Sequence, residues 1–147
     1  MTDLPVANAV RRKAGPTALT VTLDYDARML RRKRLVADNG EAFLVDLPET
    51  VSLDPGDGFE LSDGRLVGVL AASEKVLEVT GDLARLAWHI GNRHTPCQVE
   101  ATRLLIREDH VLEAMLIGLG ATVHHVTAPF KPEGGAYGHG RTMGHSH

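Results

Sequence analysis

Alternation of apolar and polar residues marks the first half of the chain. Residues 19–25 (LTVTLDY) place an apolar side chain at every second position, which predicts a strand with one buried face. Asn39-Gly40 interrupts the apolar-rich stretch 33–47, and this dipeptide favours a tight hairpin because both turn positions take positive φ. Since no segment here has helical periodicity, residues 1–73 are predicted to form a small all-β domain. Further turns are expected at 55–58 and 63–64, and the last strand of this domain is expected at 65–72.

Helical periodicity appears in the second half of the chain. Residues 82–94 predict an amphipathic helix, because apolar side chains recur at i, i+3, i+4 and i+7. Those positions are Leu83, Leu86, Ala87 and Ile90. Gly91-Asn92 is expected to end this helix in a left-handed turn. A second helix is predicted over 110–120, with Asp109 as its N-cap. Its inward positions are expected to be Leu112, Met115, Leu116 and Leu119.

Strands are predicted around these two helices. They are expected at 75–80, within 97–107 as two strands or one bent strand, and at 121–127. The resulting order, β-α-β-β-α-β, is typical of a ferredoxin-like domain with two helices on one face of a sheet. The predicted fold class is therefore α+β, with a β-rich domain (1–73) followed by a ferredoxin-like domain (74–134). Residues 135–147 are rich in glycine and histidine and are predicted to form a flexible tail.

Composition narrows the class of protein. The chain has 147 residues, a net charge of −3, 4% aromatic residues and a single cysteine. This excludes a disulfide framework and a cysteine-based zinc finger, and it argues against nucleic acid as a partner. The basic run Arg31–Arg34 is interpreted as a solvated strand face. No stretch is apolar enough to cross a membrane, and no signal-peptide core is present, so a cytoplasmic location is expected.

Histidines are the most unevenly distributed residue type. All eight follow residue 88, at His89, His94, His110, His124, His125, His139, His145 and His147. Neutral imidazole is a common ligand for nickel, copper and zinc, so the three tail histidines are candidates for loose metal binding. His94 follows the predicted first helix, where a cationic histidine would also interact favourably with the helix dipole.

Other groups have both a structural and a chemical interpretation. Glu108-Asp109-His110 offers three potential ligands in succession, but Asp109 can instead cap the second helix and Glu108 can complement its dipole. His124 and His125 should face opposite sides of a strand. Cys97 is interpreted as a core residue, with a nucleophile as the alternative. A hydrolytic metal site needs about three fixed ligands, which one chain does not visibly supply, whereas a twofold dimer would duplicate every ligand.

Several sequence blocks carry a family resemblance. HIGNRHTP (89–96), DHVLEAMLIGLGATV, PEGGAYGHG and DGRLVGVLAASEKVLEV (63–79) resemble the urease accessory protein UreE family of nickel metallochaperones. The resemblance implies a peptide-binding-like first domain and a ferredoxin-like second domain that forms a head-to-head homodimer. It also implies a nickel ion at that interface, held by the GNRH histidine, here His94, of both subunits. In this sequence Glu108 replaces a histidine of the family's His-Asp-His patch, and LPET (47–50) replaces an LPRG-like turn.

The resemblance leads to a functional hypothesis. The chain would be a metallochaperone, not an enzyme, that delivers Ni²⁺ to apo-urease together with the urease accessory GTPase and scaffold proteins. His94 would anchor the metal, Asp109 and His110 would be secondary ligands, and His139, His145 and His147 would capture or hand it over. Zn²⁺ or Cu²⁺ could bind in vitro. The alternatives are a general divalent-metal buffer or storage protein, a peptide-binding module, and a metal-dependent hydrolase.

Overall fold

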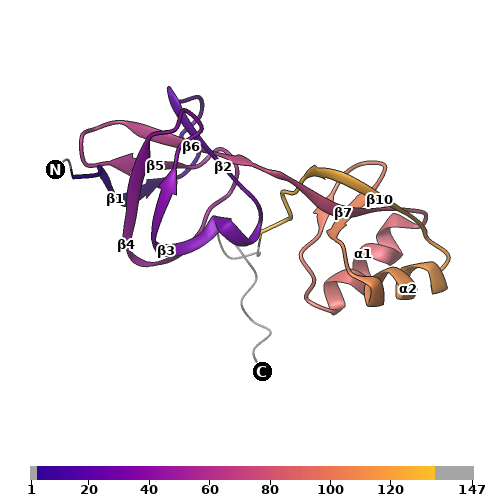
Figure 1. Ribbon diagram of the computed structural model, residues 1–147. Helices are drawn as coiled ribbons and strands as arrows, with labels where there is room; N and C mark the ends of the chain where they lie inside the picture. The colour runs from indigo at the N-terminus through magenta and orange to yellow at the C-terminus, as the bar shows by residue number, and fades with distance from the viewer. Residues whose placement is uncertain (1–2, 135–147) are drawn as a thin grey trace. The chain divides into compact units, whose positions relative to one another are not determined.

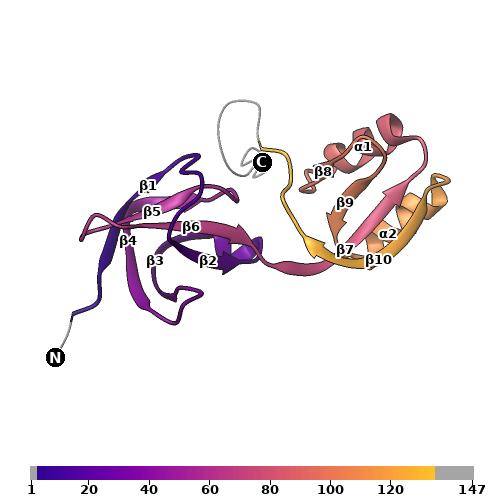
Figure 2. The same cartoon turned by 90° about the horizontal axis from the view of Figure 1, so that it is seen from above.

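A computed structural model describes residues 3–134 (Figures 1 and 2). The chain divides into two compact units, Met1–Ala72 and Ser73–His147. The first unit is built from strands with one short 3-10 helix, and the second combines strands with two α-helices. Within the described residues no helix is long and apolar enough to span a membrane.

Six strands form a curled sheet in the first unit (Figure 1). Their bounds are β1 Val6–Arg11, β2 Leu19–Leu23, β3 Met29–Val36, β4 Ala42–Ser52, β5 Gly58–Leu61 and β6 Leu66–Ala71, and the 3-10 helix η1 is Asp26–Arg28. The strand order is β2-β6-β5-β1-β4-β3. The alternation of 19–25 is reproduced, since Val21, Leu23 and Tyr25 are buried while Thr22 and Asp24 are exposed. The prediction of an all-β first part is confirmed.

The hairpin around Asn39-Gly40 forms, but its turn differs from the prediction. β3 and β4 pair antiparallel as far as Val36 and Ala42, so the loop is 37–41 rather than a two-residue turn. Gly40 has a positive φ of 93°, whereas Asn39 does not. The Asn39 side chain instead accepts a hydrogen bond from the Glu41 amide at 3.0 Å, a local bond that suits a longer loop. The predicted tight turn with positive φ at both positions was therefore wrong, whereas the predicted hairpin is confirmed.

A large irregularity interrupts the same pair of strands. Leu30 lies opposite Val51, but Arg32 lies opposite Asp46, so residues 47–50 leave the ladder. This is the LPET segment, and Pro48, Glu49 and Thr50 are exposed. Alternation alone does not reveal such a bulge, because the residues on either side of it keep a strand-like pattern.

The second unit has the order expected of a ferredoxin-like domain. Its elements are β7 Ser73–Thr80, α1 Leu83–Asn92, β8 Gln98–Val99, β9 Leu104–Arg107, α2 His110–Gly118 and β10 Thr122–Pro129. The sheet order is β10-β7-β9-β8, and both helices lie on one face of it (Figures 1 and 2). The predicted βαββαβ arrangement and α+β class are confirmed, and the segment 97–107 forms two strands rather than one.

The helices cover the sheet with the side chains that periodicity selected. Leu86 and Ile90 of α1 and Leu112 and Leu116 of α2 are buried in one cluster. The other four predicted inward residues, Leu83, Ala87, Met115 and Leu119, are partly buried against it. The predictions for these two helices hold because helical period and burial agree at every one of these positions.

Candidate metal site

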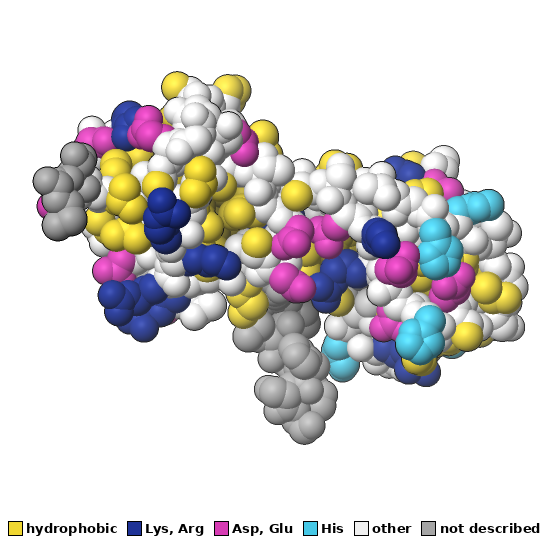
Figure 3. Space-filling view, viewed as in Figure 1, with side chains coloured by type: hydrophobic (Ala, Val, Ile, Leu, Met, Phe, Trp, Pro, Cys, Tyr) yellow, Lys and Arg dark blue, Asp and Glu magenta, His cyan; other side chains and the backbone are white. Residues whose placement is uncertain are grey.

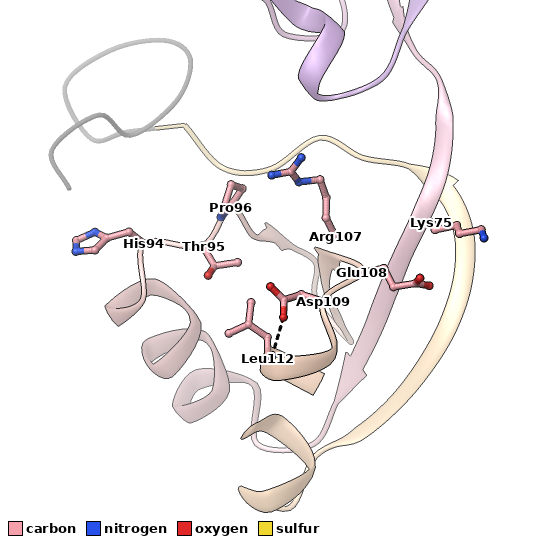
Figure 4. Close-up of a pocket in the computed structure, with 8 residues that line it drawn as sticks. All are labelled: Lys75, His94, Thr95, Pro96, Arg107, Glu108, Asp109 and Leu112. Atoms are coloured by element: carbon pink, nitrogen blue, oxygen red, sulfur yellow. Dashed lines mark hydrogen bonds between the residues drawn. The ribbon is translucent and has the colours of Figure 1, made fainter. Parts of the chain in front are cut away.

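A pocket of about 490 Å³ opens between the end of α1 and the start of α2 (Figure 4). It lies entirely within the second unit. Its lining residues are Lys75, His94, Thr95, Pro96, Arg107, Glu108, Asp109 and Leu112. The fold therefore brings His94 and Asp109 to one pocket, although the sequence treats them as separate candidates. In Figure 4 the His94 ring points outward at one end of the pocket, while the Asp109 carboxylate lies near its middle.

His94 occupies the left-handed position that ends α1. The helix continues through Asn92, Arg93 is its C-cap, and His94 has a φ of 56°. The His94 amide donates to the Gly91 carbonyl at 2.9 Å and the Thr95 amide donates to the Ile90 carbonyl at 3.3 Å. These two bonds define a Schellman motif. The expectation that Gly91-Asn92 provides the left-handed turn was wrong, because the helix includes both residues.

The end of α2 offers a direct comparison. There the left-handed position is Gly120, with a φ of 92°, and the Gly120 and Ala121 amides form the same two bonds, each of 3.0 Å. Glycine adopts this conformation without steric cost, whereas a residue with a Cβ does not. The chain thus accepts backbone strain at His94 and avoids it at the matching position. Strain of this kind is concentrated at functional sites, and the exposed imidazole is the feature that glycine would lack.

Asp109 caps α2, as predicted. Its Oδ1 atom accepts hydrogen bonds from the amides of Val111 at 2.9 Å and Leu112 at 3.1 Å. One carboxylate oxygen is therefore engaged with the helix. A metal ion would have to use the other oxygen or share this one with the cap.

Glu108 forms part of a different cluster. The Nδ1 atom of His125 lies 3.0 Å from a Glu108 oxygen, and its Nε2 atom lies 2.9 Å from a Glu113 oxygen. Hydrogen bonds to Glu113 and then to Glu108 raise the pKa of His125. His125 thus connects β10 to the start of α2, and it engages the carboxylate that precedes Asp109. The sequence reasoning missed this cluster, since nothing in the spacing of 108, 113 and 125 indicates that they meet.

The remaining sequence candidates lie at other places. His110 is the first residue of α2 and is exposed, but it does not line the pocket. His89 is half-buried and its ring meets Trp88 edge-on, with centroids 5.0 Å apart. His124 is exposed and alternates with His125 along β10. His139, His145 and His147 lie outside the described residues.

Cys97 is a poor nucleophile and a poor thiolate ligand in this position. Burial, followed by the negative charge of Glu133, raises the pKa of its thiol to about 11. Only the thiolate reacts or ligates readily. Cys97 is partly buried against the core of the second unit, which agrees with its interpretation as a packing residue.

The end of the described chain is fastened near the segment that carries His94. Phe130 is fully buried, the Lys131 amide donates to the Gln98 side chain at 2.8 Å, and the Glu133 amide donates to the Cys97 carbonyl at 2.9 Å. Cys97 follows His94 by only three positions. The last described residues are therefore held beside the loop that leads from α1 to β8.

One chain by itself does not complete a metal site in residues 3–134. No group of three or more His, Cys, Asp or Glu side chains in this part of the chain could hold a metal ion. Of the residues that line the pocket, His94, Glu108 and Asp109 each carry one potential ligand group, and they do not form such a group of three. Any tight site must therefore draw ligands from another source.

Comparisons with known proteins support one family over the length of the chain. The family model described as the UreE urease accessory protein N-terminal domain matches residues 4–72, and the corresponding C-terminal domain model matches residues 74–147. The chain is 63% identical over 150 residues to a protein of Cereibacter sphaeroides, covering 100% of this chain and 82% of that protein. It is 60% identical over 148 residues to a protein of Ruegeria pomeroyi, covering 99% of each. Both proteins are called urease accessory protein UreE.

Proposed function

The chain belongs to the family of UreE urease accessory proteins, and from that membership we propose that it is a nickel metallochaperone that delivers Ni²⁺ to apo-urease. Proteins of this family are accessory chaperones in urease maturation rather than enzymes. The proposal places the chain in the cytoplasm, where it would act with the urease accessory GTPase and scaffold proteins.

His94 is the proposed anchor of the metal. The observation that carries this proposal is its left-handed backbone, with a φ of 56°, at a position where α2 uses glycine. The strained turn fixes the direction in which the exposed imidazole leaves the helix end. Imidazole suits nickel, and also zinc and copper, which would compete in vitro. Asp109 in the same pocket is a secondary ligand, and His110 at the start of α2 is another.

A second copy of the chain is proposed to complete the site. Because no three-ligand group exists within residues 3–134, a second His94 across a twofold axis would double the ligand count. Both helices also expose apolar side chains, with Trp88 of α1 at 63%, Val111 of α2 at 58% and Ile117 of α2 at 54%. A helix that is apolar on several faces is normally covered, so these side chains fit a homodimer interface.

The tail histidines are proposed to capture the ion or hand it over. The described chain ends beside Cys97, three positions from His94, and His139 follows the last described residue, Gly134, by only five positions. A ligand on a glycine-rich segment binds loosely, because ordering the segment offsets part of the binding free energy. Loose completion of the site suits a carrier that must release its metal.

Calorimetric titration with Ni²⁺ tests the anchor. The intact protein is expected to show a tight site at one ion per two chains, and His94→Ala should lose that site while its mass remains that of a dimer. His124→Ala is the matched control, because His124 is also exposed but does not line the pocket. If the tight site survives in His94→Ala, His94 only ends a helix and the metal is held elsewhere.

A second measurement separates delivery from simple buffering. A delivery protein should form a complex with the urease accessory GTPase that depends on GTP, and it should activate apo-urease in a defined mixture. A metal buffer would bind nickel with the same affinity but form no such complex. Nickel bound without either response would therefore favour the buffer.

A further inference from the structure

Four consecutive basic residues lie on the edge strand of the first sheet. β3 is the last strand in the order β2-β6-β5-β1-β4-β3 and pairs with β4 alone. Among residues 3–134, β3 pairs with no second strand, although the amide of Met29 at its start donates to the Asp26 carbonyl of η1. Every second amide and carbonyl of an edge strand points away from its single neighbour, so β3 offers a row of groups that an added strand could bind.

The charges along this edge are only partly neutralised. Arg31, Arg32, Lys33 and Arg34 are all exposed, and Figure 3 shows basic side chains gathered over this part of the first unit. Arg31 donates to the Leu47 carbonyl at 3.2 Å, and Arg32 pairs with Asp46 at 3.2 Å. Within the described chain, the side chains of Lys33 and Arg34 form no hydrogen bond or ion pair. A run of four cations that forms one ion pair within the described residues favours an acidic ligand.

The side chains on one face of β3 restrict the choice of ligand further than the charge alone does. Arg32, Arg34 and Val36 share one face of β3, since side chains alternate along a strand. Val36 is 48% exposed, and Leu44, directly opposite Arg34 on β4, is 39% exposed. The edge thus presents two guanidinium groups followed by an apolar position.

We propose that the outer edge of β3 binds an extended acidic segment of a partner protein as an added strand. Backbone bonds to the unpaired edge would supply affinity, and alternate side chains would supply specificity. The segment would carry two acidic residues at alternate positions, facing Arg32 and Arg34, and an apolar residue facing Val36. This surface involves none of the proposed metal ligands, so it extends beyond the proposed function.

A basic edge strand could also prevent sheets from pairing or bind nucleic acid, but both roles fit the surrounding side chains less well than peptide binding does. Charged edge strands also prevent sheets from pairing with one another, but an edge that only repels neighbours would not expose Val36 and Leu44 beside its charges. Single-stranded nucleic acid would need aromatic rings on which to stack. The aromatic residues of this unit are Tyr25, Phe43 and Phe59, and all three are buried.

Fluorescence anisotropy on the full-length protein tests the proposal. The probe is a labelled peptide of sequence Glu-Thr-Glu-Thr-Val-Thr, and a peptide with lysine in place of glutamate is its control. We expect saturable binding of the acidic peptide alone. The double variant Arg32→Gln/Arg34→Gln should bind it roughly tenfold more weakly, since each cross-strand ion pair contributes modestly. The variant Arg11→Gln/Arg65→Gln removes the same charge from other positions of the first unit and should bind normally.

Amide hydrogen exchange distinguishes an added strand from a loose electrostatic contact. The peptide should slow exchange within residues 31–36 and leave β6 unchanged. Circular dichroism and thermal unfolding must show that both variants are folded. Equal loss of binding in the two double variants, or unchanged exchange in β3, would overturn the proposal. Stronger binding of oligouridylate than of the peptide would assign the surface to nucleic acid and overturn it as well.

Discussion

His94 combines a conformational cost with an exposed functional group. Its φ of 56° lies in the region that side chains with a Cβ rarely adopt, and the matching position in α2 is Gly120. Histidine tolerates this region better than most residues but still less well than glycine. This conformational cost is the observation on which we base the proposed metal-binding role of the imidazole.

His94→Gly is therefore expected to stabilise the fold while it abolishes the tight nickel site. Relief of the left-handed strain should raise the free energy of unfolding by about 1 kcal/mol. Urea unfolding in the presence of a chelator measures this change, and His94→Ala, which keeps a Cβ, should show no such gain. A glycine variant no more stable than the native chain would mean that the turn is unstrained.

At the level of helices and strands, the start of α2 serves two purposes. Asp109 caps the helix, while His125 of β10 holds the neighbouring carboxylates of Glu108 and Glu113. The segment that carries the secondary metal candidates is therefore fixed at both of its sides. The Asp109 cap responds to substitution of Asp109, and the His125 cluster responds to pH, so the two can be tested separately.

Substitutions at Asp109 separate its role as a cap from its role as a ligand. Asp109→Ala should lower the free energy of unfolding by about 1 kcal/mol, because the amides of Val111 and Leu112 lose their acceptor. Asp109→Asn keeps an oxygen acceptor and should retain most of this stability. If Asp109 is a ligand, calorimetry should show weaker nickel binding in Asp109→Asn as well. Unchanged nickel binding in the asparagine variant would leave Asp109 as a cap alone.

The His125 cluster predicts a pH dependence of stability. Hydrogen bonds to Glu113 and Glu108 raise the pKa of His125 above its ordinary value of 6.5 in the folded chain. The folded state then binds the proton more tightly than the unfolded state does, so the stabilisation is present in full below pH 6.5. It is lost as the pH rises through the raised pKa.

Unfolding measurements across pH check this prediction. The difference in unfolding free energy between the native chain and His125→Gln should be largest near pH 6 and should shrink toward pH 9. His124→Gln is the matched control, because His124 forms no ion pair within the described residues. A difference that grows with pH would contradict the assignment.

For the molecule as a whole, the described residues of one chain supply too few ligands for the tight metal site that we propose. Residues 3–134 contain no three-ligand group, and both helices of the second unit expose apolar side chains. A homodimer with α1 and α2 at its interface would account for both observations, since it doubles the number of ligands and covers the apolar side chains. Metal affinity and dimerisation should then be coupled.

Substitutions among the exposed apolar side chains of α1 and α2 test the coupling between metal affinity and dimerisation. Trp88→Ala combined with Ile117→Asp should give a monomer by light scattering, because it removes an aromatic side chain and places a charge among apolar ones. The monomer should also lose the tight nickel site although His94 is intact. Leu70→Asp, at an exposed apolar position of β6, is the control and should remain dimeric. A monomer that keeps the tight site would separate metal binding from assembly.

Local sequence was sufficient to place most helices and strands of both units and the cap of α2. Periodicity, Asp109 and the turn dipeptides act over a few residues, so short-range interactions specify them. The histidine-rich second half and the family resemblance also pointed to His94. These predictions needed no knowledge of which strands pair.

Long-range packing set the finer features. The bulge at 47–50 depends on the register between β3 and β4, which alternation does not encode. The left-handed turn lies at His94 rather than Gly91-Asn92 because packing of Ile90 and the Schellman bonds extended α1 beyond the local stop signal. His125 contacts Glu108, and His94 lines the same pocket as Asp109, although the two members of each pair are distant in the chain. Such contacts depend on how the sheet and helices pack, and no local pattern specifies them.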